Sequence, residues 1–111
     1  MGKYIITKSS NGEYRFKLQA SNGQTILVSE GYSSKQNCEN AIDSVRKHAP
    51  DDANYDRKLS SNEKHFFNLK TANGEIIGTS EMYETAAGRD NGIESVKSNA
   101  PDGMIEFQGV N

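Results

Sequence analysis

The sequence has few cysteines and prolines, contains no tryptophan, and has no long hydrophobic run. Its single cysteine, Cys38, excludes an internal disulfide and is typical of a reducing cytoplasm. No apolar stretch approaches the roughly 20 residues that a membrane span needs. The first residues do not combine a charged segment with an apolar one, as a secretory signal would. We therefore expect a cytoplasmic protein that does not enter a membrane.

The chain also lacks a strong charge of either sign, since its formal net charge is −2. This balance gives no overall attraction to nucleic acid or to an anionic membrane. The rest of the composition, with 25% charged and 33% hydrophobic residues, is ordinary for a globular protein. A length of 111 residues indicates one domain.

What the chain does contain is an internal repeat. Positions 4–54 match positions 55–105 without a gap, and roughly 19 of about 51 aligned pairs are identical. One copy alone would bury too little surface to be stable. We therefore expect a single domain over residues 1–111, built from repeat 1 (4–54) and repeat 2 (55–107) around one core. Such a fused pseudo-dimer is expected to be a monomer.

Each copy begins with three short strands. Between Glu13 and Ala20 apolar and polar residues alternate, which indicates a half-buried antiparallel strand. Asn-Gly pairs on either side of it predict hairpin turns. On the third strand Ile26 and Val28 are expected to face the core, and Leu27 to face the other side.

A helix follows the three strands. Cys38, Ile42 and Val45 recur at spacings of three and four, which predicts one apolar helix stripe. Ser33 with Gln36 matches a capping box and predicts where that helix begins. In the second copy the matching pattern predicts a helix over residues 84–99.

The tail holds one further apolar strand, Met104 to Phe107, with no third copy behind it. It stands where the segment near Tyr55 stands after the first helix, so that segment both ends repeat 1 and begins repeat 2. We predict seven strands, with the strand after each helix crossing to the other half. The fold class is α+β: two tandem β3-α-β repeats in one largely antiparallel sheet, with two helices, exchanged C-terminal strands and pseudo-twofold symmetry.

These residues resemble the YegP-like family of small uncharacterised bacterial proteins. The motif is Leu-x-x-x-Asn-Gly-x-x-Ile-x-x-Ser-Glu-x-Tyr, followed by Asn-x-Ile-x-Ser-Val and Ala-Pro-Asp, and it occurs over residues 18–51 and 69–102. The resemblance implies tandem β3-α-β motifs in one sheet with exchanged C-terminal strands. It supplies no activity and no catalytic residues.

The repeated polar residues form the first candidate site. In a functional interpretation they hold a cation or a polar ligand. In the structural interpretation, which we favour, each carboxylate meets the positive end of a helix dipole and each tyrosine packs under the helix. For the asparagines an internal hydrogen bond is favoured over a partner contact. The residues are Ser29, Glu30, Tyr32, Asn40, Ser80, Glu81, Tyr83 and Asn91.

Cys38, His48 and His65 are the usual candidates for nucleophile, base and metal ligand, but none recurs in the other copy. No metal-binding, phosphate-binding or nucleophile motif is present. We therefore expect no catalytic residues, no metal, no cofactor and no enzymatic activity.

The outer face of the sheet is the second candidate site, because basic residues surround apolar ones there. Our leading expectation is a non-enzymatic interaction or structural module that binds a protein or peptide. The alternatives are single-stranded nucleic acid on this basic face, or a small ligand in a groove on the pseudo-twofold axis. The face comprises Arg15, Lys17, Leu27, Lys64, Phe66, Lys70 and Ile76.

Overall fold

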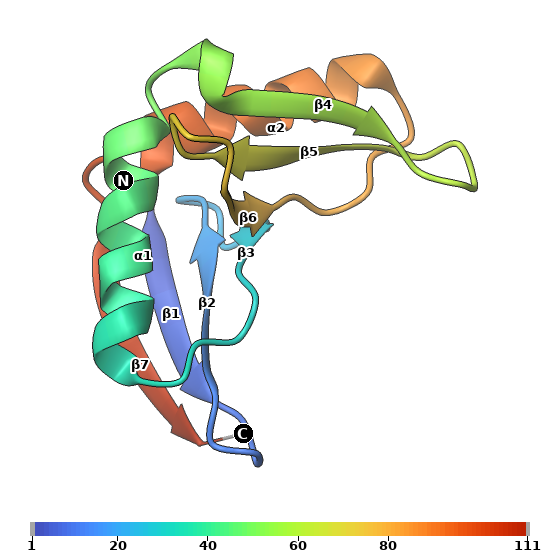
Figure 1. Cartoon of the computed structure of the whole chain (residues 1–111). Coiled ribbons are helices and arrows are strands. Elements are labelled where there is room, and N and C mark those ends of the chain that lie inside the picture. Colours follow the sequence, from blue (N-terminus) through green and yellow to red (C-terminus); the bar gives the residue numbers. More distant parts are fainter. Residues whose placement is uncertain (1, 111) are drawn as a thin grey trace.

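The computed structural model describes residues 2–110, with the backbone alone for Val110. The chain runs through three strands and a helix, repeats that order, and adds a last strand (Figure 1). The first copy contains β1 (Lys3–Lys8), β2 (Tyr14–Gln19), β3 (Thr25–Val28) and α1 (Lys35–His48), followed by a 3-10 turn (Asp52–Asn54). The second copy contains β4 (Tyr55–Leu59), β5 (His65–Lys70), β6 (Ile76–Thr79) and α2 (Ala86–Asn99), and β7 (Met104–Val110) follows it.

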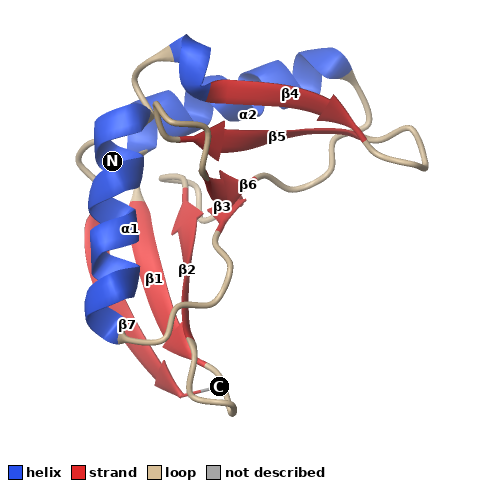
Figure 2. Cartoon of the chain, in the orientation of Figure 1, coloured by secondary structure: helices blue, strands red, loops and turns tan. Residues whose placement is uncertain are grey.

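The seven strands form one sheet in the order β4-β5-β6-β3-β2-β1-β7. Neighbouring strands are antiparallel, except that β7 lies parallel to β1. The two halves meet at one pair, Val28 with Thr79, and the strands of one half run roughly across those of the other (Figure 2). Helix α1 contacts β2, β5 and β6, and α2 contacts β3 and β5, so each helix touches both halves. The predicted α+β fold is confirmed.

The strands that follow the helices are exchanged between the halves, as predicted. β4 follows α1 but pairs with β5 of the second copy. β7 follows α2 but pairs with β1 of the first copy. Each half of the sheet contains a strand that follows the helix of the other copy in the chain. The two copies therefore share one hydrophobic core.

Two tyrosines fasten the halves to each other inside that core. The Tyr4 hydroxyl donates to the carbonyl of Ala100 at the end of α2, and the Tyr55 hydroxyl donates to the carbonyl of Ala49 at the end of α1, both at 2.7 Å. Ala49 and Ala100 are the residues that end the two helices. The first strand of each copy therefore satisfies a carbonyl at the end of the other copy's helix.

The third strand corrects one expectation. The pairing of β2 with β3 shifts register between Leu18 and Gln19, so that Leu27 lies opposite Leu18 and Val28 opposite Lys17. Leu27 is fully buried in the core, and its side chain packs on Gly78 of β6. The extra residue at this bulge turns Leu27 inward and Val28 outward, so the prediction that Leu27 lies on the open face is wrong.

The cap of α1 differs by one residue from the prediction, and α2 begins at Ala86, two residues later than predicted. Ser34, and not Ser33, caps α1 by accepting a hydrogen bond from the Asn37 backbone N–H at 3.0 Å. The Ser33 hydroxyl instead accepts from the Asn37 side chain. Thr85 caps α2 in the same way, and Ser34 and Thr85 are matching positions of the repeat.

The first turn of each copy has the same hydrogen bond but different strain. Gly12 and Glu63 occupy matching positions, both donate to a serine carbonyl at 3.0 Å, and both have positive φ, 86° and 65°. A side chain at positive φ costs about 1–2 kcal/mol, whereas glycine adopts it freely.

We predict that Glu63→Gly raises the free energy of unfolding by about 1 kcal/mol, measured by urea denaturation. Gly12→Glu is the matched control and should lower it, and the prediction is contradicted if both changes act in the same direction.

Strand β7 pairs along the whole of β1, on the side away from β2. We predict that a chain ending at Gly103 loses cooperative unfolding or dimerises, because the apolar edge of β1 becomes exposed. Circular dichroism melting and light scattering measure the two outcomes. A truncated protein that remains monomeric with an unchanged melting temperature would show that the exchanged strand is dispensable.

Candidate functional site

The serines of the repeated Ser-Glu-x-Tyr motif have a structural role. Ser29 is buried at the end of β3, where its hydroxyl accepts from the Phe16 N–H at 2.9 Å and donates to the Glu30 carbonyl at 2.9 Å. Ser80 makes the same two bonds, with Phe67 and Glu81, at 3.0 and 2.8 Å. Each serine satisfies backbone groups at the point where its strand leaves the sheet.

The tyrosines of the motif hold the connection to the helix. Tyr32 forms an isolated bridge with Tyr14, and Tyr83 forms the same bridge with His65. Both rings are half-buried against the core, and burial, with Glu30 or Glu81 nearby, raises the pKa of each phenol. Raised pKa values keep both hydroxyls protonated at neutral pH, so neither is a ready base.

The glutamates of the motif do not have the role that we favoured for them. Glu30 and Glu81 precede the helix caps Ser34 and Thr85 by four residues, and neither helix has an acidic residue in its first turn. Both side chains are exposed. The dipole explanation of these carboxylates is therefore wrong, and the fold as described makes no evident use of them.

Glu30 instead lines a cleft of about 460 Å³ between α1 and the β5–β6 hairpin. Tyr32 and Asn40 line its first side, and Glu75 and Ile76 of the other repeat line its second. Glu75, not Glu81, is thus the carboxylate across the cleft from Glu30. Sequence reasoning could not find this pair, because Glu75 matches Gln24 and is not part of the repeated motif.

The repeated asparagines are both exposed on their helices. The Asn40 side chain accepts from Gln36, one turn earlier on the same helix, at 3.0 Å. Over residues 2–110 we find no hydrogen bond from Asn40 or Asn91 to the sheet or to a connecting loop. The internal bond that we favoured is therefore not formed.

Cys38, His48 and His65 do not assemble into a reactive group. Cys38 is buried in α1, and burial raises the pKa of its thiol to about 11, which disfavours the nucleophilic thiolate. The His48 ring nitrogen Nδ1 lies 2.8 Å from the Ser44 carbonyl on the same helix, and His65 belongs to β5. Within residues 2–110 no three histidine, cysteine or acidic side chains gather as metal ligands.

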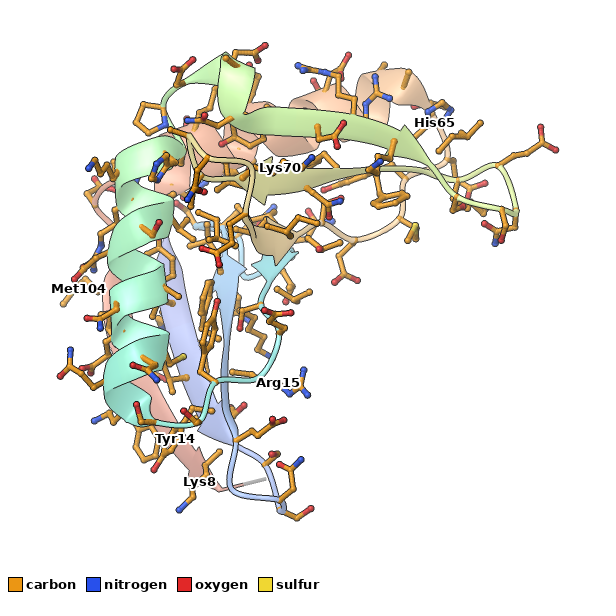
Figure 3. All side chains as sticks on the ribbon, in the orientation of Figure 1. Lys8, Tyr14, Arg15, His65, Lys70 and Met104 are labelled. Atoms are coloured by element: carbon orange, nitrogen blue, oxygen red, sulfur yellow. The ribbon has the colours of Figure 1, made fainter. Side chains whose placement is uncertain are left out.

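The seven residues of the predicted interaction face are divided by the structure. Arg15 lies on the helix-free side of the first half, whereas Lys70 belongs to the second half (Figure 3). Lys17 lines the same hollow as Arg15. Lys70 is bound to Asp56 at 2.9 Å, and Lys64 is bound to Glu84. Leu27 lies in the core, and Ile76 lines the cleft beside α1. Phe66 of β5 lies opposite Lys58 of β4. These residues do not form one continuous basic surface, which weakens the case for nucleic acid.

Two other surfaces stand out on the first half. One is a hollow of about 360 Å³ on the helix-free face, lined by Arg15, Lys17 and apolar residues of β1 and β3. The other is β7, a sheet edge with exposed Met104, Ile105 and Phe107. The alternating pattern placed Arg15 and Lys17 on the outer face of the sheet, but it did not indicate the hollow or the exposed edge at β7.

The fold and its surfaces define a class: a duplicated α+β protein whose two β3-α units share one sheet and exchange their last strands. Both copies match the family described as "Domain of unknown function (DUF1508)", over residues 9–56 and 60–106. The chain belongs to that family, whose description assigns no activity.

Relatives and solved structures agree with this assignment. The chain is 52% identical to a UPF0339 protein in the ptx operon 5′ region of Stutzerimonas stutzeri, over 94% of each chain. It is 51% identical to the UPF0339 protein YegP of Escherichia coli K12, over 95% of this chain and 96% of that protein. The solution NMR structure of E. coli YegP matches with a TM-score of 0.91 at 46% identity, over 97% of this chain and 93% of that one. A UPF0339 protein from Shewanella oneidensis matches equally, at 45% identity over 97% and 92%.

The serines of the motif should contribute to the free energy of unfolding, whereas its glutamates should not. We predict that Ser29→Ala lowers the free energy of unfolding by about 1–3 kcal/mol, because it leaves the buried Phe16 N–H without an acceptor. Glu30→Gln combined with Glu81→Gln should change it by less than about 0.5 kcal/mol, because both side chains are exposed. Urea denaturation of the three proteins compares the effects. A loss in the double variant as large as that of Ser29→Ala would restore a structural role to the glutamates.

Proposed function

We propose that this protein is a non-enzymatic, monomeric binding module that accepts an extended segment of a partner polypeptide along the free edge of β7. The observation that carries the proposal is that β7 ends the sheet with exposed apolar side chains between Met104 and Phe107, before the bulge that follows Phe107. In a parallel pair alternate backbone groups point outward, so the outer side of β7 offers hydrogen-bonding groups to another strand.

The two edges of the sheet are chemically unlike. On β7, Met104, Ile105 and Phe107 are 66%, 38% and 46% exposed, and the one charge, Glu106, is 3.4 Å from Lys3. The other edge, β4, carries charges, and Arg57 is bound there to Asp52 and Asp90, both at 3.2 Å. Charged side chains are a usual protection of sheet edges against pairing. β4 is protected in this way and β7 is not.

The side chains beside β7 define the partner. Ile105 and Phe107 lie on the helix side of the sheet, since they pair with Tyr4 and Ile6 of β1. Above Phe107 lies the ammonium group of Lys35, 4.9 Å from the ring centre. No salt bridge of Lys35 is found within residues 2–110. An added strand with apolar residues two positions apart and a carboxylate near Lys35 would match both features.

A second copy of the chain matches this edge less well. Two β7 strands paired antiparallel around Glu106 would join Ile105 to Phe107 of the copy. The same register sets Glu106 directly opposite its own counterpart. Like charges in that position destabilise a strand pair. A different polypeptide with a complementary charge is therefore the better occupant.

Selection from a random peptide library tests the proposal without a known partner. We predict that the selected peptides alternate apolar residues and contain an acidic residue. Phe107→Lys should weaken their binding about tenfold or more, because a charge replaces the apolar contact. Leu59→Lys on β4 is the matched control and should leave binding unchanged, as calorimetry would measure.

Peptides that bind Phe107→Lys as tightly as the unchanged protein would overturn the proposal. Equal loss in the Leu59→Lys control would also overturn it, since the effect would then not belong to β7. Light scattering over a range of concentrations measures self-association. A dimer that forms with the unchanged protein but not with Phe107→Lys would show that the edge binds a second copy of the chain instead of a different polypeptide.

A further inference from the structure

A row of side chains crosses the helix-free face of the first half. Ile5 of β1 pairs with Lys17 of β2, and Lys17 pairs with Val28 of β3. In the next row Thr7 pairs with Arg15. Strand pairs share a face of the sheet, so these five side chains lie together. They line the hollow of about 360 Å³, a volume within the range of small-ligand sites.

The floor of the hollow is apolar. Ile5 is only 6% exposed although no helix covers this face, and Val28 beside it is half-buried. Thr7 and Gln108 add polar groups at the margin. A ligand that lies here would contact hydrocarbon below and polar groups at one side.

The rim of the hollow is positively charged. Lys17 forms no salt bridge within the described part of the chain, and Arg15 reaches Glu13 only at 3.5 Å, with half of its side chain exposed. Glu106, the nearest acidic residue in the row of Ile5, is paired with Lys3. The charge complementary to this rim is therefore negative.

The second repeat shows that the fold does not require these residues. Its matching positions hold Phe66 in place of Arg15, Asn68 in place of Lys17 and Thr79 in place of Val28. The strands there pair in the same registers. The combination of cations and an apolar floor thus belongs to the first repeat alone, and a structural need does not account for it.

We infer that this hollow, the cationic hollow, binds a carboxylate that carries a short apolar tail. The carboxylate would lie between Lys17 and Arg15, and charge-assisted hydrogen bonds to such groups are stronger than neutral ones. The tail would cover Ile5 and Val28. Inorganic phosphate would leave the apolar floor in contact with water. Single-stranded nucleic acid would lack a stacking platform, because the aromatic that lines the hollow, Phe16, is 2% exposed.

Octanoate is the probe for this inference, with octylammonium and inorganic phosphate as ligand controls. In ¹⁵N-labelled protein, octanoate should shift the amide signals of Ile5, Lys17 and Val28 in a saturable way. Octylammonium has the tail without the negative charge, and phosphate has the charge without the tail. Both should bind at least about tenfold more weakly.

The second repeat supplies substitutions that the fold already accepts at matching positions. Lys17→Asn should weaken octanoate binding about tenfold through the lost charge, and Val28→Thr should weaken it through the lost apolar contact. Lys70→Gln is the matched control in the other half, where it removes a cation bound to Asp56, and it should have no effect. Circular dichroism melting verifies that each variant is folded.

Three results would overturn the inference: no saturable shift with octanoate, equal binding of phosphate, or equal loss in the Lys70→Gln control. Tighter binding of an oligothymidylate than of octanoate would assign the hollow to nucleic acid instead. Phe107 pairs with Ile6 and lies on the helix side of the sheet, opposite the hollow, so Phe107→Lys should still bind octanoate. The hollow and the proposed peptide edge are thereby tested separately.

Discussion

The structure depends on two reciprocal hydrogen bonds, from Tyr4 to the Ala100 carbonyl and from Tyr55 to the Ala49 carbonyl. The last carbonyls of a helix have no partner within it, and these two lie in the core, where an unpaired carbonyl would be costly. Burial raises the pKa of both phenols, so they stay protonated donors at neutral pH. Because each bond joins one copy's first strand to the end of the other copy's helix, the two copies complete one core together.

The duplication also separates structural from functional positions, because the same fold is built twice with different residues. Ser29 and Ser80 recur and make identical bonds, so their repetition is explained by the fold. Lys17 becomes Asn68 without a change in strand pairing, so the fold leaves that position free. Glu30 and Glu81 are the exception, since they recur although both are exposed. The repetition of these two glutamates therefore has no structural explanation.

Most of the fold could be predicted from the sequence, because alternation and helical spacing report which face of each element is buried. Strand β3 could not, since Ile26, Leu27 and Val28 are all apolar and no pattern tells which of them faces inward. Only the bulge opposite Gln19 decides it. The candidate sites were harder still. Glu30 and Glu75 line one cleft because α1 packs beside the β5–β6 hairpin, and Val28 lies next to Lys17 through strand pairing. The apolar strand of the tail was visible in the sequence, but its exposure follows from its place at the end of the sheet.

The odd number of strands explains why the two halves of a nearly symmetric fold have different surfaces. β7 fills the place beside β1, whereas the matching place beside β4 has no later strand to fill it. The edge at β4 carries ion pairs, and the edge at β7 carries exposed apolar side chains. The same addition places Gln108 of β7 at the margin of the cationic hollow, where the second repeat has no counterpart. One strand added to two copies is thus enough to make the first half chemically distinct, and both candidate binding surfaces lie there.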